Sequence, residues 1–256
     1  MTTVLETRGL ERRFGKLLAV DDVSITIDSD DVTSIIGPNG AGKTTLYNLL
    51  TGRLKPTGGS INLLPRDGTT LQDITGQEPF EINRLGLSRA FQINNVFDGL
   101  TVEENLRVAR ISHNRRTLDV FAIARDDDQL DEEVAELMEL IGLEEVSDTL
   151  CENLSHGDKR KVEIALSLGT DPSVVLLDEP TAGMNATETE RMVDLIRELN
   201  EKTETTFLIT EHDMDVVLGI SDRILVLDNG TLIADGSPDE VMANEQVREA
   251  YLGGDL

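Results

Sequence analysis

The stretch GPNGAGKTT, residues 37–45, decides the fold of this chain. It matches the phosphate-binding loop pattern G-x-x-x-x-G-K-S/T in full, and it stands between an expected strand and an expected helix, the context that the pattern requires. Gly37, Gly40 and Gly42 allow backbone N–H groups to converge on phosphate oxygens at a helix N-terminus. A glycine-rich turn with an incidental lysine is the alternative, and the strand–helix context argues against it. The stretch therefore predicts a nucleotide site.

Two pairs of residues are expected to carry the chemistry of that site. Lys43 would neutralise the β- and γ-phosphates, and the Thr44 hydroxyl can ligate magnesium. Far along the chain, VVLLDEP (residues 174–180) is an apolar strand that ends in two carboxylates. Asp178 can hold the magnesium through water, and Glu179 is placed to polarise the attacking water. Alone, this stretch could equally be a buried strand reaching a negatively charged helix start. Beside the phosphate loop, it completes a nucleoside triphosphatase site.

Histidine is rare in the chain, at positions 113, 156 and 212 only. A lone histidine is most often structural or simply exposed, and His113, in the polar stretch SHNRR, is expected at the surface. His212 follows TTFLIT at the end of another expected core strand, where ligands of open α/β sheets collect. We therefore expect a catalytic role for His212, beside Lys43 and Glu179.

The rest of the chain predicts an α/β core interrupted by a helical insert. Strands are expected where runs rich in β-branched residues are bounded by turn formers, at 24–28, 32–38, 58–64, 173–180, 205–212 and 222–230. From about residue 93 to 168 the pattern is helical. After residue 170 strands and helices alternate, which implies βαβ units and a parallel sheet. Asn229-Gly230 predicts a hairpin, and Ser237 with Glu240 predicts a capping box without chemistry.

Charge is the unusual feature of the composition. The 256 residues include 49 Asp and Glu against 23 Lys and Arg, a formal net charge of -26. Such a field repels nucleic-acid phosphates and anionic lipid headgroups, so no nucleic acid partner is expected. An acidic, soluble surface is the plainer interpretation. We favour adaptation to molar salt, where the Debye length falls to roughly 3 Å, because the acidic excess is spread over the whole chain.

No feature of the sequence points to a membrane span or to secretion. No apolar run approaches the roughly 20 residues needed to cross a bilayer, and the N-terminus lacks the basic-then-apolar layout of a secretory signal. The single cysteine, Cys151, cannot form an internal disulfide, which fits a reducing cytoplasm. A cytoplasmic protein is expected.

These motifs resemble the ATP-binding subunit of an ABC transporter, and they cover nearly the whole chain in the order of that family. GPNGAGKTT is similar to the Walker A loop, VVLLDEP to the Walker B strand, AFQ to the Q-loop, LSHGD to the signature motif, AGMN to the D-loop and TEHD to the switch. The resemblance implies a P-loop NTPase (RecA-like) core at residues 1–92 and 169–256, with an N-terminal antiparallel β subdomain. An inserted α-helical signature subdomain would occupy residues 93–168.

The resemblance also implies roles for individual residues. Gln92 would contact the magnesium and take part in catalysis, and His212 would sense the γ-phosphate. Phe14 would stack on adenine, a core phenylalanine being the alternative. ATP and Mg²⁺ are the implied cofactors, and the implied phosphate-binding loop comprises Gly37, Pro38, Asn39, Gly40, Ala41, Gly42, Lys43, Thr44 and Thr45.

The stretch NLSHGDKRKVEI (153–164) places a second glycine-containing polar turn before a helical run. By the resemblance, Ser155 and Gly157 would close over the γ-phosphate held by Lys43 of a second ATPase subunit. Two composite sites in a head-to-tail dimer would result. Ser155 as a helix N-cap is the plainer interpretation, and both can hold together. Three positions depart from the family's usual glycine, glutamine and aspartate: His156, Asp158 and Asn185.

Within the family, the sequence is most similar to the ATPases of branched-chain amino acid importers and the related urea and amide importers. The similarity lies in KPTGGSI, RAFQINNVFDGLTVEENL, EHDMDVVLGISDRI and REAYLGG. It implies an enzyme that hydrolyses ATP to drive solute import at the cytoplasmic face of the cell membrane. Its partners would be membrane permease subunits, a second ATPase subunit and, indirectly, an extracellular solute-binding protein.

Three other functions stay open at this point. A soluble ABC-type ATPase of DNA repair or translation would usually carry long coiled-coil insertions or two cassettes in one chain, and this chain has neither. A regulatory module that binds ATP without turnover is opposed by the intact Glu179 and His212. Another ABC cargo, such as a lipid or a metal chelate, fits as well because the ATPase does not touch the solute.

Overall fold

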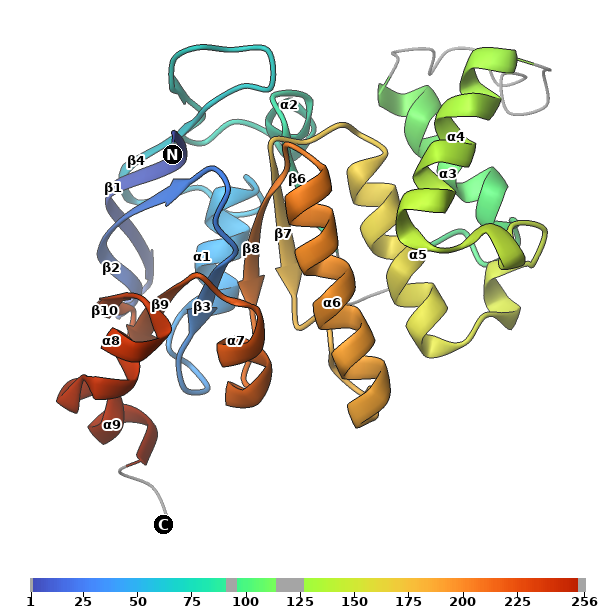
Figure 1. Ribbon diagram of the computed structural model, residues 1–256. Helices are drawn as coiled ribbons and strands as arrows, with labels where there is room; N and C mark the ends of the chain where they lie inside the picture. Colours follow the sequence, from blue (N-terminus) through green and yellow to red (C-terminus); the bar gives the residue numbers. More distant parts are fainter. Residues whose placement is uncertain (1, 91–95, 114–126, 253–256) are drawn as a thin grey trace.

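Two β-sheets and the helices between and beside them form the layers of the molecule (Figure 1). The computed structural model describes residues 2–90, 96–113 and 127–252. For residues 251 and 252 it describes only the backbone. Helix α1 (Lys43–Leu50) lies between the two sheets, and α5 (His156–Leu168) and α6 (Ala186–Lys202) cover the far face of the larger one. The predicted α/β core with an inserted helical part is confirmed.

The larger sheet is parallel except at one edge. Its strand order is β10-β9-β3-β8-β7-β6, and β10 is the antiparallel edge strand. The members are β3 (Thr33–Ile36), β6 (Leu87–Ala90), β7 (Val174–Asp178), β8 (Thr206–Thr210), β9 (Arg223–Asp228) and β10 (Thr231–Gly236). On β7, Val174 and Leu176 pack toward α1, whereas Val175 and Leu177 pack toward α5 and α6. Burial on both faces explains why these strands are apolar runs rather than alternating ones.

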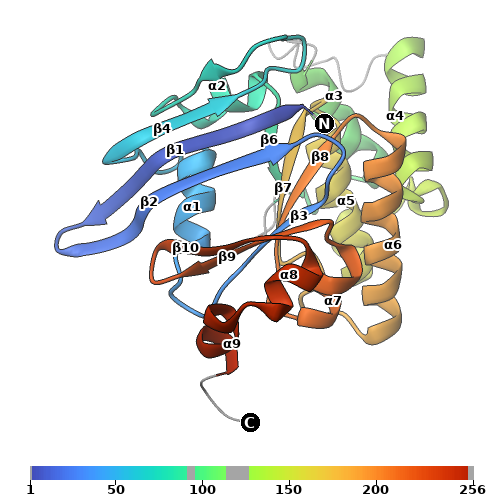
Figure 2. The same ribbon diagram turned by 60° about the vertical axis from the view of Figure 1, so that its left-hand side comes forward.

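The smaller sheet is antiparallel and covers α1 (Figure 2). Its order is β2-β1-β4-β5, formed by β1 (Thr3–Phe14), β2 (Leu17–Asp28), β4 (Gly58–Leu63) and β5 (Gln72–Asp73). The strand patterns predicted only the end of β2 and β4, whereas the resemblance predicted an N-terminal antiparallel β subdomain, which is confirmed. Strand β1 was missed because one of its faces is polar: TVLETRGLERRF carries charges at five of its twelve positions.

The helical part packs on one end of the core. Helices α3 (Val102–His113), α4 (Asp128–Ile141) and α5 share an apolar cluster with the sheet, and the guanidinium of Arg110 on α3 lies 2.7 Å from the Glu133 carboxylate on α4. These helices all fall inside the predicted insert 93–168. The boundary at residue 92 stays a prediction, since it lies outside the described residues.

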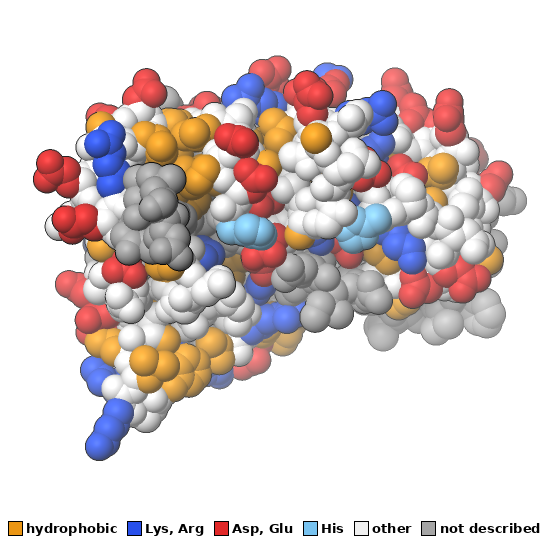
Figure 3. All heavy atoms as spheres, turned by 90° about the horizontal axis from the view of Figure 1, so that it is seen from below, with side chains coloured by type: hydrophobic (Ala, Val, Ile, Leu, Met, Phe, Trp, Pro, Cys, Tyr) orange, Lys and Arg blue, Asp and Glu red, His pale blue; other side chains and the backbone are white. Residues whose placement is uncertain are grey.

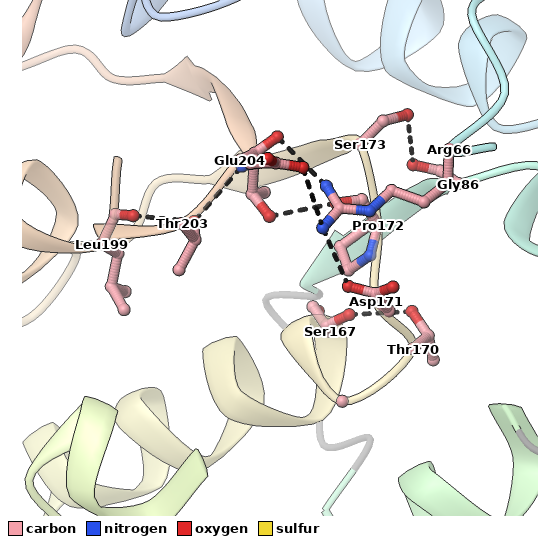
Figure 4. Close-up of polar contacts among 12 residues, drawn as sticks. Arg66, Gly86, Ser167, Thr170, Asp171, Pro172, Ser173, Leu199, Thr203 and Glu204 are labelled. Atoms are coloured by element: carbon pink, nitrogen blue, oxygen red, sulfur yellow. Dashed lines mark hydrogen bonds and ion pairs between the residues drawn. The ribbon is translucent and has the colours of Figure 1, made fainter. Parts of the chain in front are cut away.

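A polar network ties the loop after α5 to the core (Figure 4). Arg66 lies 3.2 Å from the Asp171 carboxylate and 3.6 Å from that of Glu204, and it donates to the Glu204 carbonyl at 3.3 Å. Ser173, at the start of the next strand, donates from its hydroxyl to the Gly86 carbonyl at 3.2 Å. These contacts fix the loop that joins α5 to β7.

The C-terminal segment returns along the sheet edge. Asn229 and Gly230 have φ values of 46° and 85° and join β9 to β10, as the Asn-Gly pair predicted. Ser237 accepts from the Glu240 N–H and caps α8 (Pro238–Ala243), which confirms the predicted capping box. Helices α2 (Pro79–Arg84), α7 (Met214–Ile220) and α9 (Glu245–Leu252) complete the described α-helices, and short 3-10 helices lie at Glu144–Val146 and Cys151–Asn153. Among the helices of residues 2–90, 96–113 and 127–252, none combines the length and the apolar character of a membrane span.

Candidate functional site

The phosphate-binding loop lies at the carboxyl end of β3, where the ends of the parallel strands meet. Gly37 has φ 156°, and a Cβ there would stand 2.3 Å from the Leu227 carbonyl oxygen. Gly42 has φ 105°, and its Cβ would stand 2.5 Å from that of Ala19. Gly42 is also the N-cap of α1 and offers no side-chain acceptor. The first turn of α1 therefore presents backbone N–H groups, as an anion site needs.

Lys43 points back into its own loop. Its ammonium donates to the carbonyl of Gly37 and, at 3.3 Å, to that of Pro38. Burial lowers the pKa of Lys43, and the nearby carboxylates of Glu179 and Asp178 act against that shift. The lysine and both predicted carboxylates are thus close enough to interact electrostatically.

A cavity of about 310 Å³ opens above the loop. Besides Leu17 and Ala19, it is lined by the predicted residues Phe14, Pro38, Asn39, Gly40, Ala41, Gly42, Lys43, Thr44, Thr45 and Glu179. Phe14 is 42% exposed, and the Arg12 guanidinium lies 4.6 Å from the centre of its ring. Figure 3 looks onto the face at this end of the molecule, where hydrophobic side chains gather in two places on the left of the view and acidic side chains and histidines lie across the middle. The cavity offers a ring face beside a phosphate loop.

Asp178 is held by hydrogen bonds on both carboxylate oxygens. The Thr210 hydroxyl donates to Oδ1 at 2.6 Å, and the Arg89 guanidinium donates to Oδ2 at 2.7 Å. A second nitrogen of Arg89, Nη1, donates to the Asn48 side-chain oxygen at 2.8 Å. Each carboxylate oxygen keeps a further lone pair, so Asp178 and the exposed Thr44 hydroxyl fit Mg²⁺, which prefers oxygen ligands and retains several waters.

Glu179 and His212 are brought together from neighbouring strands. The His212 Nδ1 lies 3.5 Å from the Glu179 carboxylate. Glu179 has φ 49°, and its N–H donates to the Thr210 carbonyl at 2.9 Å. Left-handed backbone is rare for a residue with a Cβ and is typical of functional sites, where the surroundings hold it in place.

The second glycine-containing turn stands apart from the cavity. Ser155 is the N-cap of α5: its oxygen accepts from the Asp158 N–H at 3.1 Å, and its hydroxyl donates to the Asp158 carboxylate at 2.7 Å. Neither Ser155 nor Gly157 belongs to the described lining of the phosphate-loop cavity. One chain therefore does not bring the two anion-binding turns to one ligand.

Gln92 lies outside the described residues, so the structure does not place it. Several buried residues around the site were not found from the sequence. Tyr47, fully buried on α1, donates from its hydroxyl to the Leu208 carbonyl at 2.8 Å, and burial raises its pKa well above the ordinary value. Arg89 lies on β6, a strand that was not predicted, directly before the stretch AFQ, and nothing local marks the partner it binds.

Comparison with known proteins agrees with this geometry. The chain matches the family model described as ABC transporter over residues 20–182, and the model described as branched-chain amino acid ATP-binding cassette transporter over residues 231–256. It is 44% identical to the high-affinity branched-chain amino acid transport ATP-binding protein LivG of Salmonella typhimurium, over 98% of each chain. It is 41% identical to the corresponding BraF of Pseudomonas aeruginosa, again over 98% of each.

A solved structure shows the same architecture. An ATP-binding cassette of an ABC transporter, determined in its ADP conformation, superposes with a TM-score of 0.85 at 33% identity. The likeness covers 99% of this chain and 100% of that one. The whole fold, including both sheets and the helical part, is shared.

Proposed function

The chain belongs to the ABC transporter family, among ATP-binding proteins of the branched-chain amino acid type, and we propose that two ATPase chains hydrolyse ATP in composite sites to drive solute uptake. The observation that carries this proposal is the meeting of Lys43, Asp178, Glu179 and His212 at the carboxyl ends of the parallel strands, while Ser155 and Gly157 do not line the phosphate-loop cavity. The four residues together can hold and cleave one nucleotide. The turn with Ser155 and Gly157 can contact the nucleotide of another chain.

Within one chain, each residue has a separate task. Lys43 and the N–H groups of the loop bind the β- and γ-phosphates, and Phe14 stacks on adenine. Magnesium, held by Thr44 and through water by Asp178, would neutralise charge on the phosphate oxygens. Glu179 polarises the attacking water, and His212, 3.5 Å away, contacts the γ-phosphate.

Across the dimer, Ser155 and Gly157 meet the γ-phosphate bound by the partner's Lys43. A γ-phosphate between two helix N-termini joins the subunits only while ATP is intact, because hydrolysis removes the shared anion. His156 and Asp158 stand in that turn, so a histidine and a carboxylate approach the phosphate where relatives commonly have neither.

The permease partner would dock on a cleft between the core and the helical part. This cleft, of about 440 Å³, has Pro79, Phe80, Ala90 and Val108 in its lining, and Phe80 is 57% exposed. Phe97, which is 55% exposed, lies just after residues 91–95, which are outside the described part of the chain. Exposed apolar side chains of this kind mark interaction surfaces. Docking there would place the protein at the cytoplasmic face of the membrane.

Branched-chain amino acids are the proposed cargo, delivered by an extracellular binding protein. The support is the match of the C-terminal residues 231–256 to the branched-chain amino acid model, together with the names of the LivG and BraF relatives. Urea or short amides are the second candidate, from the sequence similarity alone.

Turnover by Glu179→Gln tests the catalytic part of the proposal. A glutamine keeps the size of the side chain but removes the negative charge, so kcat should fall by about 100-fold or more while ATP still binds. The matched control is Glu190→Gln, the same change at an exposed position on α6, and it should leave kcat unchanged. Wild-type turnover in Glu179→Gln would contradict the assignment.

A further inference from the structure

A buried arginine on α5, Arg160, contacts the backbone of the segment 178–182, which contains Asp178 and Glu179. The Arg160 guanidinium donates from Nη2 to the carbonyls of Asp178 at 2.6 Å and Glu179 at 2.7 Å, and from Nε to that of Pro180 at 3.4 Å. Its remaining nitrogen donates to the Glu163 carboxylate at 2.6 Å. The side chain thus joins the helix that begins at the signature turn to three consecutive carbonyls around Glu179.

A second side chain on the same face extends this contact. His156 precedes Arg160 by four residues, so the two side chains are neighbours on the helix. Its Nε2 lies 3.1 Å from the Ala182 carbonyl oxygen. From Asp178 to Ala182, four of the five carbonyls therefore face donors from the first two turns of α5.

The opposite side of the segment is fixed by the end of β8. The buried Glu211 accepts from the N–H of Thr181 at 3.0 Å and from its hydroxyl at 2.8 Å, and Thr210 accepts from the N–H of Glu179. Glu179 itself has φ 49°. A backbone in this region persists only where its surroundings determine it, and Arg160 supplies two or three of the bonds that do so.

We propose that Arg160 is a positioning residue that sets the Glu179 carboxylate for water attack and so joins the signature helix to the chain's own catalytic residue. The proposal rests on the catalytic role of Glu179 given above. Because Ser155 is the N-cap of the helix that carries Arg160, a displacement at Ser155 reaches Glu179 through α5 and the Arg160 side chain. ATP of the partner would thereby influence hydrolysis in this chain.

Arg160→Met keeps the aliphatic length and removes every donor. A misplaced catalytic group costs about 100-fold in rate, so kcat should fall by about that factor. The KM for ATP should stay within about twofold, since the phosphate loop is untouched. Arg160→Lys, which keeps a donor for one or two carbonyls, should recover part of kcat. The matched control is Arg223→Met, which removes a half-buried arginine that pairs with Asp235 and donates to the Thr26 carbonyl, outside α5 and the cavity lining, and should keep kcat.

Arg160→Met also affects stability, because it removes the guanidinium that donates to the buried Glu163 carboxylate. Burial already raises the pKa of Glu163. Adding Glu163→Gln removes this charge, so the double variant should regain melting temperature without regaining kcat. Recovery of kcat together with melting temperature would show that Arg160 serves only the fold.

The decisive comparison is made in the Glu179→Gln background. If Arg160 acts through Glu179, Arg160→Met lowers the residual rate there by less than about twofold. The same fold-loss in both backgrounds, or near wild-type kcat in the single variant, would overturn the inference. Wild-type turnover by Glu179→Gln alone would instead defeat the proposed function, so the two failures are distinguishable.

Discussion

Replacing Arg89 by methionine is expected to destabilise the folded chain strongly. Its guanidinium lies 2.7 Å from the Asp178 carboxylate, and the two side chains are only 7% and 14% exposed. Methionine fills much of the same space beside the Tyr47 ring, which Arg89 covers at 5.4 Å, but it carries no charge. Asp178 would then keep a largely buried charge that still accepts from the Thr210 hydroxyl but has lost the Arg89 guanidinium.

The magnitude follows from burial. Removing one partner of a buried ion pair costs about 3–5 kcal/mol, mostly from the charge left behind. A chain of this size loses about 2–4 °C in Tm for each kcal/mol, so Tm should fall by about 6–20 °C. The loss is a large share of the roughly 5–15 kcal/mol that stabilises a typical domain.

Urea unfolding at fixed KCl, without nucleotide, measures this loss, and Arg8→Met is its matched control. The Arg8 guanidinium lies at a similar distance from a carboxylate, 2.9 Å from Glu6, but Arg8 is 72% exposed. Exposed pairs contribute about 0–1 kcal/mol. A loss below about 1 kcal/mol for Arg89→Met, equal to that of the control, would refute the claim that this pair is energetically buried.

Three further outcomes are expected. Burial and the neighbouring Asp222 raise the pKa of Asp31 above its ordinary value of 3.8, so the folded state binds the proton more tightly. The unfolding free energy of the wild type should therefore fall relative to that of Asp31→Asn as pH rises above 3.8, whereas the difference between the two should stay constant below pH 3.8. Parallel curves over the whole pH range would contradict this. Thermal unfolding should shift upward as KCl rises to multimolar, given the net charge of -26, and a flat or falling midpoint would remove the adaptation to salt. Phe97→Asp should spare ATP hydrolysis yet abolish transport by the assembled complex, and full transport would refute docking at this surface.

Local chemistry explains what could be predicted from the sequence. The phosphate loop, the turn at Asn229-Gly230 and the cap at Ser237 each use residue types that one backbone geometry requires. Alternation of strand and helix after residue 170 predicted the parallel sheet, because a crossover needs a helix between parallel strands.

Contacts between distant segments could not be predicted in this way. Arg89 binds the Asp178 carboxylate, and Arg160 binds the carbonyls of Asp178 and Glu179. The sequence around each arginine does not indicate which residue it contacts. Gly37 and Gly42 were expected to serve phosphate alone. In the fold they also give room to the carbonyls of Leu227 and Ala19, a demand that arises only once β9 and β2 pack against the loop.

The central claim, that two chains share each ATP, is tested most directly by size-exclusion chromatography in ATP and magnesium. In the Glu179→Gln background, which retains ATP, the chain should elute as a dimer. Adding Ser155→Arg should return it to monomer without weakening nucleotide binding, because the arginine side chain obstructs the turn that would meet the partner's γ-phosphate. Thr69→Arg, the same bulk and charge at an exposed position between β4 and β5, should leave the dimer intact. Equal dimer fractions with and without Ser155→Arg would contradict the composite site.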